Sequence, residues 1–400
     1  MITSATRFTD KSGFLSVYFN GTNWIGIEPS DLTAVFLPAG VTSDPLALIS
    51  QVRGTDIAMG AKSVGLAMGY SSGNAASANG WTGAADQPTT FGTLRTHDTG
   101  VFWQDIETSQ GVYNAAAVAR LDSMVNAASA AGKDVLYSIG YVPAWASGGS
   151  IQAPPTNNAF VSNFVAWLLA RYGTKITHIE GWNEPNVSGS FTGTLAQLVA
   201  HQKAIWTAVQ TYNTANSTTI KVLSPQWTFQ SGVAATLGLN AYMAAAYADS
   251  GSTGYYCNVI AYHFYSETNS LRFDRACVNA VITAIAAFTG ASALELWCTE
   301  VGDSFPNARA VKEMIAFCLA NNVKRVILYD WYLPGGSGSD MRLSRVLTPA
   351  QFDAITAIFQ GKTMNCLNSY RSQSINNGGS PQTQGAPLGA TINNVAVLLT

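Results

Sequence analysis

Two glutamates that each end an apolar, strand-like run are the residues best placed for acid-base or nucleophilic chemistry. Glu184 follows the run I-E-G-W-N at 179–183, and Pro185 cannot donate to a β ladder, so a strand should stop beside this glutamate. Glu300 follows the run L-W-C-T at 296–299 in the same way. Two carboxyl groups can supply the proton and the negative charge that hydrolysis of a glycosidic bond needs. Taken alone, either residue is equally compatible with a solvated charge at a strand end.

The elements that must position these glutamates alternate along the chain between apolar runs and helical patterns. Strands are expected at 63–70 and 223–229, among others. Apolar residues recur at helical spacing within 115–131, 159–172 and 195–212, and further helices are expected around 235–249, 271–288, 307–321 and 349–360. This alternation favours a parallel sheet with both faces covered, a class of fold in which barrels carry their chemistry at the carboxyl ends of the strands.

The string W-N-E-P-N at 182–186 resembles the acid/base signature of retaining glycoside hydrolases built on (β/α)8 barrels, most closely glycoside hydrolase family 39 of clan A. Five other segments are similar to successive strands of such barrels: 94–113, 135–147, 259–265, 296–302 and 326–332. The resemblance covers roughly residues 62 to 362. It implies an α/β fold, namely a (β/α)8 TIM barrel.

The resemblance also implies a division of labour between the two glutamates. Glu184 would act as general acid and later as base, and Glu300 as the nucleophile that forms a glycosyl-enzyme intermediate. This requires a protonated Glu184 and an ionised Glu300 in the free enzyme. A retaining enzyme of this kind should hold its carboxyl groups about 5 to 5.5 Å apart. Asp303, which stands where relatives often carry an aromatic residue, is the fallback nucleophile, and Glu267 is another carboxylate in a neighbouring loop.

Three polar residues near the strand ends are expected to support this pair. By position in the motif, Asn183 should hydrogen-bond the sugar 2-hydroxyl, an interaction that strengthens at the transition state. Tyr265 should donate to Glu300 and help to keep it ionised. His263 lies two residues before Tyr265 on the same face of the strand. It is either a residue of the substrate site or a histidine satisfied within the core.

Arg95, His97 and Asp98 cluster at the expected end of the second strand. The arginine could hold the nucleophile and the aspartate could bind a sugar hydroxyl. An ion-pair network in the barrel mouth is the alternative for all three. Glu180 lies four residues before Glu184, so alternation along a strand puts both side chains on the same face. It is therefore expected to point into the barrel as part of an interior polar layer.

Tryptophans at strand ends are candidate sugar-stacking residues. Trp331 is expected to form the platform under the scissile sugar, and Trp145 could line a neighbouring subsite. Trp103 and Trp182 are compatible with either a core position or a stacking role.

The resemblance leaves both ends of the chain to be explained by their own patterns. Residues 1–61 contain short alternating runs separated by Gly, Asn and Pro, which predicts a β-rich accessory region. Residues 62–362 form the expected catalytic barrel. Residues 363–400 combine the polar stretch N-N-G-G-S-P-Q with a strand-like V-A-V-L-L-T, so this extension should either add a strand to the accessory region or form a tail.

Composition excludes several classes of partner. Charged residues make up 11% of the chain and the net charge is −2, so nothing would attract a phosphate backbone and nucleic acid is not expected as a partner. No apolar run reaches the roughly 18 residues of a membrane helix, and the N-terminus lacks the basic-then-apolar layout of a secretory signal. The low charge nevertheless favours a protein that works outside the cell. The five cysteines show no C-x-x-C spacing and the four histidines are scattered, so no metal or other cofactor is expected.

The leading hypothesis is therefore a retaining glycoside hydrolase that acts on a β-linked polysaccharide or oligosaccharide. The ten tryptophans suggest several subsites and an endo mode of action. An exo-acting β-xylosidase-like enzyme shares the same motifs and stays open as an alternative. The other alternative is a carbohydrate-binding barrel without turnover, although a binder has no need of two carboxylates.

Overall fold

The computed structural model describes most of the chain between residues 57 and 368 and short strands towards both ends. The described ranges are 57–69, 80–228, 238–266, 281, 285–303, 311, 314–315, 318–319, 323–332, 342–361 and 363–368, with 8–9, 16–19, 24–27, 34–36 and 395–398 outside that span. The chain divides into two compact units. One comprises Met1–Gly60, Leu319–Asn321 and Gly361–Thr400, and the other Ala61–Cys318 and Asn322–Gln360.

Within the described residues, eight parallel strands of the larger unit close into a ring. In order they are β6 (Val64–Ala67), β7 (Thr93–Arg95), β10 (Asp134–Ser138), β11 (His178–Glu180), β12 (Lys221–Leu223), β14 (Val259–Ser266), β15 (Glu295–Asp303) and β16 (Arg325–Leu328). Each strand pairs with the next, and β16 pairs with β6 to complete the ring. A two-residue strand, β13 (Trp227–Thr228), also pairs with β14. The fold is therefore the expected (β/α)8 TIM barrel.

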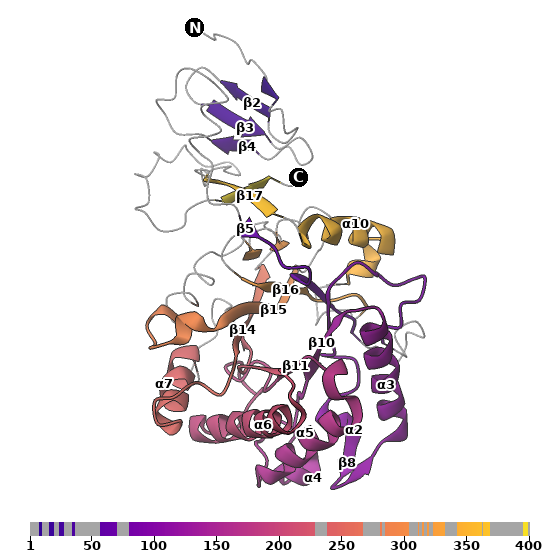
Figure 1. Ribbon diagram of the computed structural model, residues 1–400, viewed down its shortest axis with the longest axis vertical. Helices are drawn as coiled ribbons and strands as arrows, with labels where there is room; N and C mark the ends of the chain where they lie inside the picture. The colour runs from indigo at the N-terminus through magenta and orange to yellow at the C-terminus, as the bar shows by residue number, and fades with distance from the viewer. Residues whose placement is uncertain are drawn as a thin grey trace. The chain divides into compact units, whose positions relative to one another are not determined.

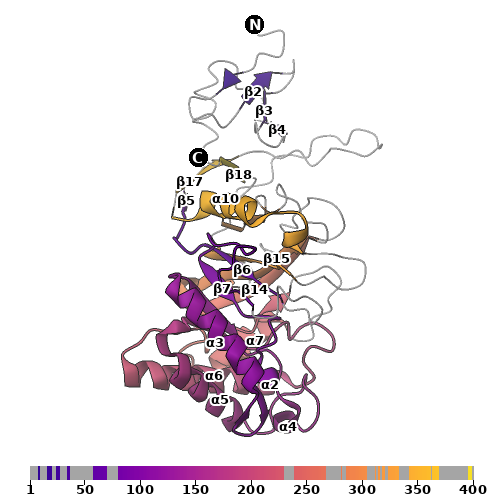
Figure 2. The ribbon, with the colours of Figure 1, turned by 90° about the vertical axis from the view of Figure 1, so that its right-hand side faces the viewer.

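Helices connect these strands on the outside of the ring (Figures 1 and 2). The main ones are α3 (Ala115–Ala130), α5 (Ala159–Tyr172), α6 (Leu195–Asn216), α7 (Leu239–Asp249) and α10 (Pro349–Phe359), and two single turns, α2 (Trp103–Ile106) and α4 (Ala144–Ser147), lie in loops. Short 3-10 turns occupy Gly173–Lys175, Ala291–Ala293 and Leu343–Arg345. Among the described helices, none has the length and apolar character needed to cross a membrane.

Local sequence signals explain where the long helices begin. The side chain of Asn114 accepts hydrogen bonds from the first backbone N–H groups of α3. Thr194 with Gln197, and Thr348 with Gln351, form capping boxes at the starts of α6 and α10. The helices predicted at 115–131, 159–172 and 349–360 are observed within one residue, and the helix predicted at 195–212 continues to residue 216.

The barrel interior is filled by apolar side chains from several strands, because parallel strands covered by helices are buried on both faces. The central cluster consists of Leu136, Leu223, Val259, Ala261, Trp297 and Ile327, all fully buried. Cys257, Cys298 and Cys318 are buried free thiols, in keeping with the expected role of cysteines as small core residues, whereas the side chains of Cys277 and Cys366 lie outside the described part.

Two details of the barrel differ from expectation or fall outside the description. The fifth strand, predicted as one run over 223–229, is split into β12 and β13, because residues 224 and 225 leave the ladder and Gln226 forms only an isolated bridge to Asn183. The helices predicted at 271–288 and 307–321 lie mostly outside the described residues.

The strands described in the smaller unit form two antiparallel sheets. Strands β1 (Phe8–Thr9), β2 (Ser16–Phe19), β3 (Trp24–Ile27) and β4 (Ala34–Phe36) form one of them. In the other, β17 (Thr363–Asn368) pairs with both β5 (Ile57–Ala58) and β18 (Val395–Leu398). Thus a strand before the barrel and two strands after it share a sheet. The division of the chain into accessory region, barrel and extension stays a prediction.

Candidate active site

The barrel brings Glu184 and Glu300 together at the carboxyl ends of β11 and β15. One carboxylate oxygen of each lies in a cluster, shared with a ring nitrogen of His263, whose atoms are all within 4.8 Å of one another. Glu184 has a left-handed backbone with φ of 48°, which for a residue other than glycine is strained and is concentrated at functional sites. Its side chain is 22% exposed and that of Glu300 6%. Glu184 is therefore the more accessible acid of the pair.

Arg95, fully buried at the end of β7, holds three partners at once. Its Nη1 donates to Glu300 Oε1 at 2.6 Å, its Nε to Glu180 Oε1 at 2.6 Å, and its Nη2 to Asn183 Oδ1 at 3.2 Å. Ser138 Oγ also donates to Glu180. Glu180 thus belongs to an interior polar layer, as expected. Arg95 thus places one positive charge between the two buried acids, and hydrogen bonds from a guanidinium are what a buried carboxylate needs in order to remain charged.

The contact with Arg95 also fixes the orientation of Asn183. A guanidinium group can only donate, so the amide oxygen must face it and the amide nitrogen must point elsewhere. Asn183 is mostly buried and its backbone bridges to Gln226. Its Nδ2 is consequently left as a donor at the strand end, beside Glu184.

Tyr265, at the end of β14, donates its hydroxyl to Glu300 Oε2, as its position in the sequence predicts. Gly302 makes room for this arrangement. A Cβ atom there would lie 2.9 Å from the carbonyl oxygen of Tyr329 and 3.0 Å from the ring of Tyr265. Any larger residue would push these two tyrosines apart.

His263 contacts both acids rather than acting as a satisfied core histidine. Its Nδ1 lies 2.9 Å from Glu184 Oε1 and 3.4 Å from Glu300 Oε2. In the tautomer that carries its proton on Nδ1, the ring can donate to an oxygen of either acid. Its Nε2 is buried and has no hydrogen-bond partner among the described residues. The ring therefore donates towards the acid pair.

These contacts set the charge state of Glu300. Burial by itself would raise the pKa of Glu300, but the adjacent His263, Arg95 and His97 outweigh burial and lower this pKa to about 2. Tyr265 stays a neutral donor, because burial and then the charge of Glu300 raise its pKa well above the ordinary range. Glu300 is thus an ionised, hydrogen-bonded carboxylate at neutral pH.

Asp98 and His97 extend the site beyond the glutamates. His97 Nε2 lies 3.7 Å from Glu300 Oε1 and 3.5 Å from Asp98 Oδ2, and its Nδ1 lies 3.3 Å from Ser138 Oγ. Asp98 has a left-handed backbone with φ of 52°, and its side chain is 30% exposed. It accepts a hydrogen bond of 2.6 Å from Tyr329 Oη.

Sequence reasoning missed two tyrosines of this site. Tyr329 directly follows β16, and its ring meets the edge of Tyr265 at a centroid distance of 6.3 Å. Burial, followed by the charges of Asp98, Glu184 and Glu300, raises the pKa of Tyr141, which therefore lies within electrostatic reach of all three acids. Side chains alternate between the two faces of a strand, so Tyr329 and Trp331, two residues apart, point to the same side. Tyr329 is the nearer of the two to the strand end, and the sequence alone could have shown this.

Trp331 is not the sugar platform that was predicted. Its side chain is 1% exposed, and its ring packs edge-on against Phe352 of α10 at 5.5 Å. The strand ends at Leu328, so Trp331 has already turned towards the outer helix and Tyr329 takes the place at the mouth. Trp103 and Trp182 are also fully buried and belong to the core.

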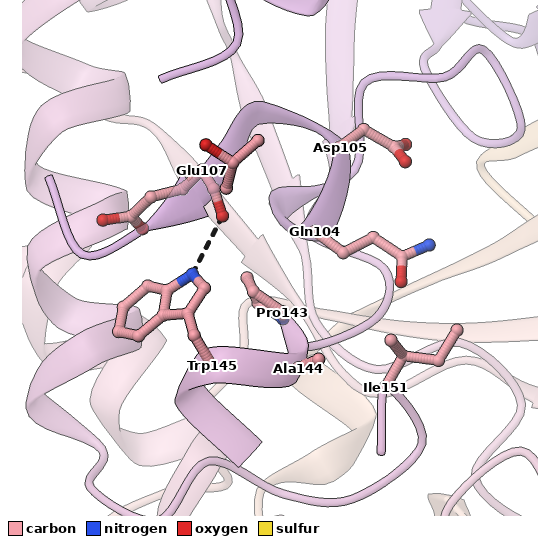
Figure 3. A pocket seen from close by; sticks show the side chains of 8 residues that line it. Gln104, Asp105, Glu107, Pro143, Ala144, Trp145 and Ile151 are labelled. Atoms are coloured by element: carbon pink, nitrogen blue, oxygen red, sulfur yellow. Dashed lines mark hydrogen bonds between the residues drawn. The ribbon is translucent and has the colours of Figure 1, made fainter. Parts of the chain in front are cut away.

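Trp145 lies in α4 and lines a pocket with residues of α2 and β8 (Glu107–Ser109), and neither Glu184 nor Glu300 belongs to that lining (Figure 3). The two competing carboxylates cannot be compared with the pair, because the side chain of Asp303 and all of Glu267 lie outside the described residues.

The cluster of Glu184, His263 and Glu300 also has the donor atoms of a cation site. The guanidinium of Arg95 already supplies positive charge 2.6 Å from Glu300, however, and would repel a metal ion bound there. The geometry suits two carboxyl groups with separate roles, one exposed to a ligand and one held ionised, which is the arrangement needed for glycoside hydrolysis.

Comparison with known proteins agrees with this geometry. The family model for cellulase, glycosyl hydrolase family 5, matches residues 90–332. A family 39 glycoside hydrolase from the gut symbiont Bacteroides cellulosilyticus WH2 is similar in structure, with 15% identity, a TM-score of 0.54 and coverage of 90% of this chain and 76% of that one. The GH39 enzyme from Xanthomonas axonopodis pv. citri shows 16% identity, a TM-score of 0.54 and coverage of 80% and 71%.

A glucosidase from Croceicoccus marinus also shares the fold, with 16% identity, a TM-score of 0.54 and coverage of 78% of this chain and 69% of that one. No curated protein sequence matches the chain. The expected resemblance to (β/α)8-barrel glycoside hydrolases of clan A is confirmed. Because the matched model spans well over half of the sequence, the chain belongs to the cellulase family, glycosyl hydrolase family 5.

Proposed function

We propose that this glycoside hydrolase is a retaining enzyme that cleaves β-linked polysaccharides or oligosaccharides by double displacement. The observation that carries the proposal is the convergence of Glu184 and Glu300, whose nearest clustered oxygens lie within 4.8 Å. Inverting enzymes keep their carboxyl groups roughly 6.5 to 9.5 Å apart to admit a water molecule, whereas retaining enzymes hold them about 5 to 5.5 Å apart. The close approach therefore favours retention.

In the first step, Glu300 attacks the anomeric carbon while Glu184 transfers its proton to the leaving glycosidic oxygen. The bond to the leaving group breaks and an ester forms between the sugar and Glu300. The low pKa of Glu300 keeps the attacking carboxylate ionised. In the second step, Glu184 takes a proton from water, the resulting nucleophile attacks the same carbon, and Glu300 leaves as a carboxylate.

The surrounding donors have roles that follow from their contacts. Arg95 and Tyr265 each bind one oxygen of Glu300 and so aim the nucleophile. His263 donates to Glu184 Oε1, which leaves Oε2 to carry the acid proton. Asn183 offers its Nδ2 to the sugar 2-hydroxyl. Asp98 accepts a hydrogen bond from another hydroxyl, with His97 beside it.

A mechanism-based inhibitor tests the proposal directly. A 2-deoxy-2-fluoro-β-glycosyl fluoride of a sugar that the enzyme cleaves should label the protein once, and peptide mass spectrometry should place the label on Glu300. Proton NMR of early products should show the β anomer first. Labelling of Asp303 would reassign the nucleophile, and release of the α anomer would refute retention.

Several finer inferences belong to the same proposal. An endo mode is supported by aromatic residues at more than one strand end, and an exo-acting β-xylosidase-like mode is the competing one. A family-39-like arrangement is supported by the two solved family 39 structures. Action outside the cell is supported only by the low proportion of charged residues, 11%. Product lengths measured by mass spectrometry on plant and bacterial polysaccharides would separate endo from exo action.

A non-catalytic carbohydrate-binding barrel is the alternative from another class. It predicts that the folded protein binds glycans but releases no product and takes no label. The ionised, triply supported Glu300 argues against it, because a binding site gains nothing from a carboxylate aimed at an anomeric carbon.

A further inference from the structure

A second pocket opens on the same face of the barrel as the acid pair, between the loops that follow β7 and β10. It has a volume of about 450 Å³. Gln104 and Asp105 of α2 and Thr108 of β8 (Glu107–Ser109) supply polar groups, and Pro143, Trp145 and Ile151 supply apolar surface (Figure 3). All of these residues belong to the larger unit.

Contacts beneath the pocket hold its tryptophan in one orientation. Trp145 Nε1 donates to the carbonyl oxygen of Glu107 at 2.9 Å, as the dashed line in Figure 3 marks. Its ring meets Trp103 and Phe160 edge-on, at centroid distances of 6.3 and 5.1 Å. A large side chain that is fixed before a ligand arrives loses little conformational entropy on binding.

Asp105 gives the pocket a carboxylate of which only one oxygen accepts a hydrogen bond from the described part of the protein. Its Oδ2 accepts a hydrogen bond from the backbone N–H of Phe102 at 3.0 Å, and its Oδ1 has no protein partner recorded in the described part of the chain. The side chain is half-buried. Such an oxygen gains most from a ligand that can donate a hydrogen bond into the pocket.

The pocket is close to the catalytic pair. Burial raises the pKa of Asp105 and outweighs the hydrogen bond from Phe102 and the charge of Arg120, which both lower it. The charge of Asp98 adds a smaller rise, so these two carboxylates are within electrostatic reach. Phe102, which binds Asp105, contacts the ring of His97 at 4.9 Å and that of Tyr141 at 5.8 Å. A chain of contacts therefore runs from Glu300 through His97 and Phe102 to the pocket.

We propose that this pocket is a subsite for one uncharged sugar unit of a glycan whose scissile bond lies between Glu184 and Glu300. A pyranose has an apolar C–H face and a rim of hydroxyl groups, which match Trp145, Pro143 and Ile151 on one side and Asp105, Gln104 and Thr108 on the other. Asp105 and Glu107 are two acids against the single positive charge of Arg120 beside Asp105, so the pocket disfavours a uronate. This inference rests on the proposed function, and it identifies the pocket as the place where a longer substrate gains additional affinity.

Dependence on substrate length tests the subsite. Trp145→Ala and Asp105→Asn are compared with the unmodified enzyme on an aryl monoglycoside and on neutral oligosaccharides of increasing length. Both variants should lose roughly ten-fold or more in kcat/KM once the oligosaccharide is long enough to reach the pocket. Activity on the aryl monoglycoside should be unchanged, because its single sugar occupies the site at the acid pair and does not reach the pocket.

Trp167→Ala is the matched control, since Trp167 is also a half-exposed tryptophan but stacks on Tyr113 outside the pocket. It should leave the length profile unchanged. Trp145→Phe, which keeps an aromatic face, should restore most of the loss and guards against misfolding of the alanine variant. An equal loss at every length, or none, would overturn the subsite. Failure of the unmodified enzyme to cleave any glycoside would instead refute the proposed function.

Discussion

The hydroxyl of Tyr329 donates to Asp98 Oδ2 at 2.6 Å, which links the segments that follow β16 and β7, the two strands on either side of β6. His97 Nε2 approaches the same oxygen at 3.5 Å, so Asp98 Oδ1 has no protein hydrogen-bond partner within the described part of the chain. Tyr329 therefore orients a carboxylate that has an acceptor to offer to a sugar hydroxyl.

Tyr329→Phe should lower kcat/KM by about ten-fold on an aryl glycoside, because it removes a hydrogen bond to a charged group and keeps the ring. The loss should disappear for the one monodeoxy substrate that lacks the hydroxyl bound by Asp98, and persist for the other deoxy analogues. Tyr332→Phe, which removes a similar bond of 3.2 Å to Asp86, is the control and should have little effect. Equal losses on all deoxy substrates would contradict the role of Asp98.

Glu184→Gln should slow hydrolysis by roughly 10² to 10⁴-fold for a substrate with a poor leaving group, since general acid catalysis contributes on this order. The loss in the first step should be small for a dinitrophenyl glycoside, whose leaving group needs no proton. Steady-state and burst kinetics across a series of aryl leaving groups provide the measurement. Glu295→Gln, at the start of the strand that carries Glu300, is the control and should leave the leaving-group dependence unchanged.

Arg95→Lys should move the acidic limb of the pH profile to higher pH. Arg95 is among the groups that lower the pKa of Glu300 to about 2, so weakening this contact raises that pKa towards its ordinary value of 4.5. The nucleophile then becomes protonated at a higher pH than in the unmodified enzyme. Profiles of kcat/KM between pH 3 and about 8 measure the shift.

The control for this variant is Arg325→Lys, because Arg325 pairs with Asp134 at 2.6 Å at the opposite ends of the strands. It should affect stability without moving the acidic limb. If the profile of Arg95→Lys coincides with that of the unmodified enzyme, Arg95 does not set the charge state of the nucleophile.

His201→Leu should make the protein less sensitive to acid. His201 is fully buried in α6, neither ring nitrogen has a hydrogen-bond partner among the described residues, and burial lowers its pKa from 6.5 to about 4. Between these values the unfolded chain binds a proton that the folded chain does not, so stability falls as pH drops from 6.5 towards 4. The decrease in the free energy of unfolding between pH 7 and pH 5 should be smaller by roughly 2 kcal/mol in the variant. Urea unfolding measures it, with Thr207→Ala on the exposed side of α6 as control.

Chelation should leave the activity unchanged. The positive charge beside Glu300 comes from Arg95, so the reaction proposed here needs no metal ion. Rates are compared before and after exhaustive dialysis against EDTA. Activity that is lost on dialysis and recovered with a divalent cation would assign the metal a part in catalysis.

The sequence by itself predicted the barrel, through its resemblance to (β/α)8-barrel glycoside hydrolases, and it pointed to Glu184 and Glu300 as the candidate acid pair. Alternating apolar runs and helical patterns favoured a parallel sheet, and the strings W-N-E-P-N and L-W-C-T-E resemble the segments of such barrels that carry the two acids, although these residues lie far apart in the chain. Arg95, His263 and Tyr265 could be named for the same reason, because side chains near the carboxyl ends of parallel strands converge on one mouth.

Only the tertiary structure decided which aromatic residues reach that mouth. By alternation along a strand, Tyr329 and Trp331 would point to the same side. The strand ends at Leu328, however, and the chain then turns. Tyr329 therefore meets Asp98, whereas Trp331 packs against α10. The three contacts of Arg95 likewise depend on distances between strands that no local pattern contains. Spacing along a chain sets the direction of a side chain within its own element, whereas its neighbours are set by how separate elements pack.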